Sequence, residues 1–285
     1  MVKFFVLSRF IVRFYKSNIV FVISHNFTMY FQKGFFMINS NTFSNFNSKY
    51  PIYADLHTHS ISSGHGSEDT ITDMIRCASE SGLSLFGISD DGPATSSSAK
   101  PSYFQSLKLA DRDRFGIRVL YGAELNIINT AGDVDLDDEI LSALDYAIIS
   151  IHPPIFKPYH DKDLSSAYIR AMDHPKVRFL GHIDDARFPV DFEYLLEIAK
   201  EKHVYPEINN GSLMPDAYRI NGQENCRRIL SICKKLDLPV LLSSDSHGKK
   251  NIGNMQYIFP LLEELDFPAH LVLNSDLSVL SEIIR

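Results

Sequence analysis

Short apolar runs alternate with amphipathic stretches along the chain from Ile52 onward. The apolar runs have the length and aliphatic character of buried strands, whereas the stretches between them have helical spacing. This alternation favours a parallel sheet, and a closed barrel is the economical arrangement for so many strands. The predicted strands are Ile52–Leu56, Leu85–Ile88, Val119–Leu125, Tyr146–Ile151, Arg178–Leu180, Val204–Ile208 and Val240–Leu242.

Three stretches give the clearest helical pattern. Thr72–Ser81 ends before Gly82, a residue type that commonly terminates helices. Asp191–Lys202 and Gln223–Leu236 each place their apolar residues on one face. We therefore expect an α/β fold in which these helices cover the strands.

Almost every predicted strand delivers a His, Asp or Glu at its carboxyl end. In a parallel barrel, that end is where functional sites are built, so these side chains are expected to meet. They are His57 and His59 in the first segment, Asp90 and Asp91 after the second, Glu124 in the third, His152 after the fourth, His182 after the fifth, Glu207 in the sixth, and Asp245 and His247 after the seventh.

These residue types are suited to binding divalent metal ions. Histidines two positions apart, such as His57 and His59, point to the same side of a strand and can bind one ion, and Asp245 and His247 repeat that spacing. Glu124 has two carboxylate oxygens and could bridge two ions. Imidazole and carboxylate ligands without thiolate suit Zn²⁺, Mn²⁺ or Fe²⁺. Two such ions bound about 3.5–4 Å apart can hold a hydroxide between them, so the ligand pattern predicts hydrolytic chemistry.

Each residue alone has a plainer interpretation. A single histidine such as His174 or His203 is more often a surface or structural residue than a ligand. A His-x-His spacing also arises by chance in barrel strands. The prediction therefore depends on the convergence of many such residues at successive strand ends.

Composition limits the choice of partners and compartment. The net charge is −7, but residues 1–54 hold six basic and no acidic residues, so the remainder, with 22 basic and 35 acidic residues, has a net charge of −13. Such a domain would repel a nucleic-acid backbone, which argues against a nucleic-acid partner. The three cysteines include no Cys-x-x-Cys pair, and we expect a reducing, cytoplasmic location.

Residues 1–50 are predicted to form a basic, aromatic-rich extension, and residues 51–285 the functional domain. Arg9, Arg13 and Lys16 interrupt the apolar runs of the extension, so it contains no uncharged stretch of about 20 residues that could span a membrane. The composition leaves three interpretations open: a targeting segment, an upstream start codon with the true start at Met29 or Met37, or a poorly ordered extension.

Several ordered motifs resemble those of the PHP (polymerase and histidinol phosphatase) superfamily, and most closely its YcdX-like phosphatase branch. The resemblance covers roughly Ile52 to Arg285. The motifs are Asp55–Ser60, Gly122–Glu124 and Ser244–His247. The resemblance implies a distorted (β/α)7 TIM-like barrel with three metal ions at the C-terminal face of the strands, and Zn²⁺ or Mn²⁺, with Fe²⁺ as an alternative, as those ions.

The resemblance also implies how the ligands are divided among the ions. His57, His59, Glu124 and Asp245 would bind the first ion, and Glu124, His152 and His182 the second. His65 and His247 would bind the third. Asp91 stands where the branch usually has a histidine for this site, so the third site would be retained with a harder ligand, be weaker, or be lost.

The resulting hypothesis is hydrolysis of a small phosphomonoester by a metal-bound hydroxide. Glu124 and Asp245 are the predicted central catalytic residues, and His160, Arg187 and Lys157 are candidate helpers in loops. Each helper taken alone is more simply interpreted as a surface residue, and Asp55 either orients a ligand imidazole or has a structural role. The alternatives are a histidinol phosphatase, a nuclease or proofreading enzyme, which the acidic domain argues against, and a metal-binding regulatory protein without catalysis. The sequence leaves the substrate and the oligomeric state open.

Overall fold

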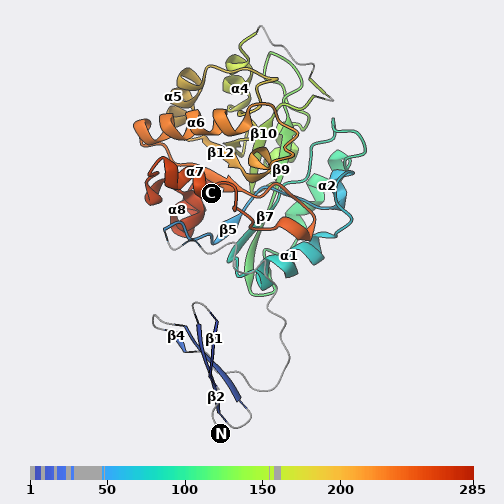
Figure 1. Ribbon diagram of the computed structural model, residues 1–285. Helices are drawn as coiled ribbons and strands as arrows, with labels where there is room; N and C mark the ends of the chain where they lie inside the picture. Colours follow the sequence, from blue (N-terminus) through green and yellow to red (C-terminus); the bar gives the residue numbers. More distant parts are fainter. Residues whose placement is uncertain are drawn as a thin grey trace. The chain divides into compact units, whose positions relative to one another are not determined.

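The computed structural model describes residues 47, 49–153, 155–156 and 162–285, together with four strands nearer the N-terminus (Figure 1). The chain divides into two compact units, Met1–Ser40 and Asn41–Arg285. In the first unit the four strands form an antiparallel sheet in sequence order. They are β1 (Phe4–Leu7), β2 (Phe10–Tyr15), β3 (Asn18–Ile23) and β4 (Phe27–Thr28).

The second unit is built on a nearly closed barrel of parallel strands. Each strand pairs with the next parallel strand along the chain, and β8 (Asp113–Arg114) adds a short antiparallel pair to β9. All seven predicted strands are present, so the prediction of a distorted TIM-like barrel is confirmed. They are β5 (Ala54–Asp55), β7 (Leu85–Ile88), β9 (Ile117–Asn126), β10 (Tyr146–Ser150), β11 (Val177–Leu180), β12 (Tyr205–Asn209) and β13 (Leu241–Ser243).

Two sets of hydrogen bonds close the barrel between its first and last strands. At the carboxyl ends, β6 (Thr58–His59) pairs in parallel with β14 (Ser246–His247). Lower down, Asn274 lies between β5 and β13, where its amide donates to the carbonyls of Ala54 and Leu242 and accepts from the Leu242 N–H. The junction between β5 and β13, here called the seam, is therefore the place where the barrel departs from a continuous sheet.

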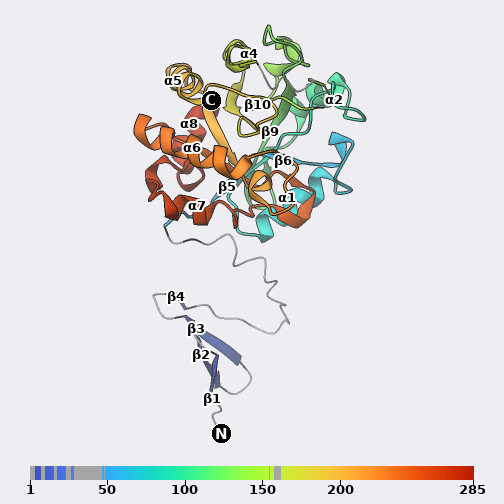
Figure 2. The same ribbon diagram turned by 45° about the horizontal axis from the view of Figure 1, so that its top comes forward.

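Helices surround the strands (Figure 2). The three predicted helices are confirmed as α1 (Ile71–Glu80), α5 (Phe192–Lys202) and α6 (Gly222–Leu236). Thr70 and Asp73 form a capping box at the start of α1, and Asp191 caps α5 by accepting from the Tyr194 N–H. The other α-helices are α2 (Pro101–Ser106), α3 (Asp138–Leu141), α4 (Ser165–Ala171), α7 (Phe259–Glu264) and α8 (Leu277–Ile284).

The apolar core has two parts, separated by the alternation of side chains along the strands. On β10, Ala147 and Ile149 belong to the larger cluster, whereas Tyr146 and Ile148 belong to the smaller one. Leu280 and Ile284 of α8 also belong to the smaller cluster. In the larger cluster, Cys226 and Cys233 are buried on one face of α6, as the helical pattern predicted.

Within the described residues, no helix has the length and apolar character needed to cross a membrane.

Candidate metal centre

The alternation along β9 carries Glu124 into the barrel. Leu120 belongs to the smaller cluster, so Gly122 and Glu124, two and four residues further on, face the same way. A Cβ on Gly122 would lie 2.8 Å from the Tyr146 ring, so glycine leaves room there for that ring. Apolar residues therefore fill the amino ends of the strands, and Glu124 lies buried above them toward the carboxyl ends.

The other predicted ligands come from the segments that follow the strands, and the structure brings them together around Glu124. Four of them (His57, His59, Asp91 and His182) are buried, three (His152, Asp245 and His247) are partly buried, and the side chain of His65 is 50% exposed. His57 and His59 lie at β5 and β6, His65 follows η2 (Ile61–Ser63), Asp91 follows β7, His152 follows β10, His182 follows β11, and Asp245 and His247 lie at β13 and β14.

One cluster joins His57, His59, Glu124 and Asp245. Oε2 of Glu124 lies 3.2 Å from Nε2 of His57 and 3.5 Å from Nε2 of His59. Oδ1 of Asp245 lies 3.2 Å from Nε2 of His59 and 3.7 Å from Nε2 of His57. The four side chains therefore direct nitrogen and oxygen atoms toward one point.

A second cluster uses the other oxygen of Glu124. Oε1 lies 2.9 Å from Nε2 of His182 and 3.4 Å from Nε2 of His152. Glu124 therefore faces two groups of imidazoles, one with each oxygen.

The third cluster contains His65, Asp91 and His247. Nε2 of His65 lies 3.3 Å from Nε2 of His247 and 3.9 Å from Oδ2 of Asp91. The same oxygen of Asp91 is 3.2 Å from Nδ1 of His59. Asp91, the residue that departs from the usual motif, therefore lies close to the other two side chains of this cluster.

These clusters have the properties expected of metal-ligand sets. Buried polar atoms are normally hydrogen-bonded, and ligand atoms that share one zinc ion at about 2.1 Å lie about 3.0–3.4 Å apart. Among the described residues, several buried atoms of the clusters lack a hydrogen-bond partner. They are Nε2 of His57, Nε2 of His59, Oδ2 of Asp91, Oε1 of Glu124 and Oδ1 of Asp245. The residues present therefore fit divalent ions.

The pKa values of the buried histidines also indicate a site that attracts cations. Burial lowers the pKa of His59, but Asp91 and Asp245 outweigh burial and raise it to about 10. Burial also opposes protonation of His57, yet the charges of Glu207, Glu124 and Asp245 raise its pKa well above the usual value. A site that holds protons this strongly is a strongly negative site, and it would attract cations for the same reason.

Two of the clustered residues have unusual backbones. His182 and Asp245 have φ angles of 55° and 52°, in the left-handed region that residues with a Cβ seldom adopt. Such conformations cost about 1–3 kcal/mol each and are concentrated at functional sites. Their presence at two cluster residues supports a functional constraint on these turns.

Further residues hold the clustered side chains in place. Nδ1 of His152 lies 2.8 Å from Oδ1 of Asn126, whose amide donates to Asp135 over 2.7 Å. Asp90, next to Asp91, accepts instead from the Ser60 hydroxyl over 2.8 Å and so fixes the turn after His59.

Asp55 accepts from the Ser244 hydroxyl (2.5 Å) and from the Gly253 N–H (2.8 Å), which fits the structural role rather than the orientation of an imidazole. It therefore anchors the chain on either side of Asp245 and His247.

Arg219 is a site residue that the sequence did not reveal. Its Nη2 lies 2.7 Å from Nε2 of His182 and 3.0 Å from Oδ2 of Asp245. It follows η4 (Asn210–Leu213), in a loop without hydrophobic periodicity or a recognisable motif, so no pattern distinguished it from a surface arginine.

Arg187, a predicted helper, forms an ion pair with Asp185 and packs over the ring of Tyr218 at 4.1 Å. Asp185 also accepts from the Ile220 N–H over 3.4 Å, so this pair holds both sides of Arg219. The other predicted helpers, His160 and Lys157, lie outside the described residues.

A pocket of about 390 Å³ adjoins the clusters through Arg219, which lines it. Met214, Pro215 and Ala217 give it an apolar part, and Asn221 and Gln223 a polar part. Its size suits a small organic molecule.

The fold and the clusters define an α/β-barrel protein with a candidate multi-metal centre at the C-terminal face of its strands. The PHP domain profile matches residues 55–211. The chain belongs to the PHP domain family, as the motifs predicted.

Its relatives include bacterial proteins named probable phosphatase. One from Clostridium acetobutylicum is 36% identical over 231 residues, which cover 81% of this chain and 93% of that protein. One from Clostridium novyi is 35% identical over 222 residues, covering 78% and 90%. The fold is also similar to that of histidinol phosphate phosphatase from Lactococcus lactis, solved with zinc, L-histidinol and phosphate. That similarity has a TM-score of 0.53 and 20% identity, over 75% of this chain and 94% of the other.

Proposed function

We propose that this protein is a metal-dependent hydrolase that removes phosphate from a small phosphomonoester at a site of three divalent ions. The observation that carries the proposal is the convergence of buried imidazole and carboxylate atoms without hydrogen-bond partners. The relatives named probable phosphatase support the reaction class. Zn²⁺ and Mn²⁺, with Fe²⁺ as an alternative, are the ions that suit these ligands.

The ligand sets follow the three clusters. His57, His59, Glu124 and Asp245 would hold the first ion, and Glu124, His152 and His182 the second, with Glu124 bridging. His65, Asp91 and His247 would hold the third, which includes the one carboxylate that departs from the usual motif.

When bound, such ions supply a hydroxide nucleophile at neutral pH and neutralise the charge on the phosphoryl oxygens. The chain itself supplies orientation. Arg219 would donate to a phosphoryl oxygen, because a guanidinium is always charged and its Nη2 lies among the ligands. The leaving group would lie in the pocket beside Arg219, where Met214 and Ala217 offer apolar contact. Arg187 would act as a positioning residue for the Arg219 loop.

The test is a phosphatase assay on metal-free and metal-reconstituted protein. Elemental analysis identifies the bound ions, and p-nitrophenyl phosphate with Zn²⁺, Mn²⁺ or Fe²⁺ measures turnover, followed by a panel of small phosphorylated metabolites. We expect turnover only after reconstitution. Identical turnover with and without metal would refute the mechanism, and metal binding without turnover on any substrate would favour a regulatory protein.

A narrower candidate is hydrolysis of L-histidinol phosphate. The observation that favours it is the fold similarity to the Lactococcus lactis enzyme solved with L-histidinol and phosphate. It predicts a kcat/KM for L-histidinol phosphate well above those for the rest of the panel, and growth of a histidine auxotroph that lacks this phosphatase. Comparable rates on many substrates and no rescue would exclude it.

A further inference from the structure

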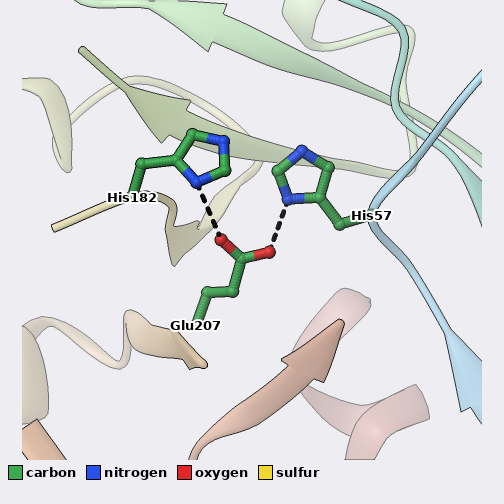
Figure 3. A group of neighbouring side chains, drawn as sticks. All are labelled: His57, His182 and Glu207. Carbon is green, nitrogen blue, oxygen red and sulfur yellow. Dashed lines mark hydrogen bonds and ion pairs between the residues drawn. The ribbon is translucent and has the colours of Figure 1, made fainter. Parts of the chain in front are cut away.

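Glu207 lies on β12 and contacts two imidazoles that belong to different clusters (Figure 3). Oε1 lies 2.5 Å from Nδ1 of His57, and Oε2 lies 3.6 Å from Nδ1 of His182. The Ser243 hydroxyl donates to Oε1. Oε2 is buried and lacks a hydrogen-bond partner among the described residues.

The tautomer of His182 follows from Arg219. A guanidinium only donates hydrogen bonds, so Nε2 of His182, 2.7 Å from Nη2 of Arg219, must be an acceptor. In the neutral ring the proton is therefore on Nδ1, which lies 3.6 Å from Oε2 of Glu207 (Figure 3) and 3.4 Å from Nδ2 of Asn209. The amide nitrogen of Asn209 donates to Asp245 and has no lone pair to offer, so Oε2 of Glu207 is the acceptor that the Nδ1–H faces.

His57 follows the same logic. Its Nδ1 lies within hydrogen-bond distance of the Glu207 carboxylate, so in the neutral ring that an ion requires, Nδ1 carries the proton and Nε2 presents its lone pair toward Glu124 and Asp245. A single carboxylate thus faces the Nδ1 side of both rings, and both Nε2 atoms face the clusters.

We propose that Glu207 is a shared positioning residue that fixes the Nδ1–H tautomers of His57 and His182 and thereby couples the first and second ion sites. The proposal rests on the ligand sets given under Proposed function. Carboxylates behind ligand imidazoles commonly set the tautomer and ring orientation, and their loss weakens metal binding about 10–100-fold. Here one carboxylate contacts an imidazole ring in each of two sites, so its loss should weaken ion binding at both sites.

The same three side chains could in principle hold an ion of their own. The separation of 2.5 Å between Nδ1 of His57 and Oε1 of Glu207 argues against this, because ligand atoms that share an ion lie about 3 Å apart. An orienting role uses the observed distances without any rearrangement.

The key variant is Glu207→Gln, which keeps the size of the side chain. The neutral amide has one acceptor oxygen and one donor group, so it can accept from only one of the two Nδ1–H groups. We expect affinity for two ions to fall about 10–100-fold. His152→Ala, which removes a ligand from the second cluster alone, is the single-site reference, and Glu201→Gln, the same change at an exposed glutamate of α5, is the matched control.

Binding is measured by equilibrium dialysis against buffered free Zn²⁺ with elemental analysis. Long-range ¹H–¹⁵N NMR on zinc-loaded protein with ¹⁵N-labelled histidine reads the tautomers. We expect Glu207→Gln to weaken the binding of two ions and to alter the Nδ1–H signals of His57 or His182. His152→Ala should weaken the binding of one ion, and Glu201→Gln should retain all ions. If Glu207→Gln does not fold, Glu207→Asp, which keeps the charge on a shorter side chain, takes its place with a smaller expected loss at both sites.

The outcomes separate the two proposals. Wild-type protein that binds no ions would refute the proposed function. Wild-type protein that binds ions, with Glu207→Gln unchanged in affinity and tautomers or weakened at one ion only, would refute the shared role of Glu207 and leave the proposed function standing. A loss in Glu201→Gln equal to that in Glu207→Gln would also refute it, because the affinity would then not depend on the carboxylate behind the two imidazoles.

Discussion

Glu124 faces two groups of imidazoles, one with each carboxylate oxygen, at the centre of the clusters. A position of this kind is sensitive to charge as well as to shape, because both oxygens must offer a lone pair. Glutamine has nearly the same size but replaces one acceptor with an NH₂ group, so it separates the two effects.

We expect Glu124→Gln to lower kcat/KM by about 10³-fold or more, since a displaced ion removes several kcal/mol of transition-state stabilisation. Steady-state kinetics and metal content measure this. Glu139→Gln, on the exposed surface of α3, is the control and should match wild type. A Glu124→Gln enzyme with normal turnover and metal content would contradict the bridging role.

Arg219→Ala should lower kcat/KM about 10–100-fold, because charge-assisted hydrogen bonds are worth about 1.5–3 kcal/mol. The measurement is kinetics alongside elemental analysis, and the metal content is expected to stay the same. Arg228→Ala, an exposed arginine on α6 that pairs with Glu193 at 3.7 Å, should have no effect. Loss of ions in Arg219→Ala would point to a structural role instead.

Some residues of the site could be predicted from the sequence and others could not. Strand-end position and His-x-His spacing singled out His57, His59 and Glu124, and the structure brings these side chains together. The ligand set itself stays a prediction until ions are measured. Arg219 could not be predicted, because the path of an irregular loop depends on contacts such as the Asp185–Arg187 pair rather than on local pattern.

At the scale of elements, the sequence predicted all seven strands of the barrel, since buried parallel strands form distinct apolar runs. It did not reveal β6, β14 or β8, each only two residues long. Strands that short carry no periodicity. The pair β6 and β14 depends on partners nearly two hundred positions apart in the chain.

The seam of the barrel can be tested through Asn274. Asn274→Ala should destabilise the protein by about 3 kcal/mol or more, because it leaves buried backbone groups of Ala54 and Leu242 without partners. Urea unfolding of metal-loaded protein measures the change. Ser275→Ala, which removes one hydrogen bond to the Pro51 carbonyl, should cost about 1 kcal/mol. Equal costs for the two variants would argue against Asn274 as the closing residue.

At the scale of the whole molecule, the concentration of buried charge links ion binding to stability and to pH. In ion-free protein the pKa of His59 is about 10, above its ordinary value of 6.5, so its protonation contributes stability that is present below pH 6.5 and lost as pH rises through 10. Ions must displace such protons from the imidazoles before they bind.

Bound ions should therefore stabilise the protein more at pH 8 than at pH 6. At a free ion concentration 1,000-fold above Kd, each ion adds about 4 kcal/mol, which corresponds to a rise in Tm of about 10 °C. Thermal unfolding with saturating Zn²⁺ or with a chelator, at both pH values, gives the two differences. A stabilisation that is equal at the two pH values would argue against ligation through His57 and His59.

The seam also has a consequence for how the protein is made. Asp245 and His247 follow the last strand of the barrel, and the pairing of β14 with β6 places them beside His59. A nascent chain on the ribosome cannot complete the first or third ligand set until residue 247 has emerged. Under the proposed function, ion loading would then follow synthesis and depend on the free ions that the newly released polypeptide encounters.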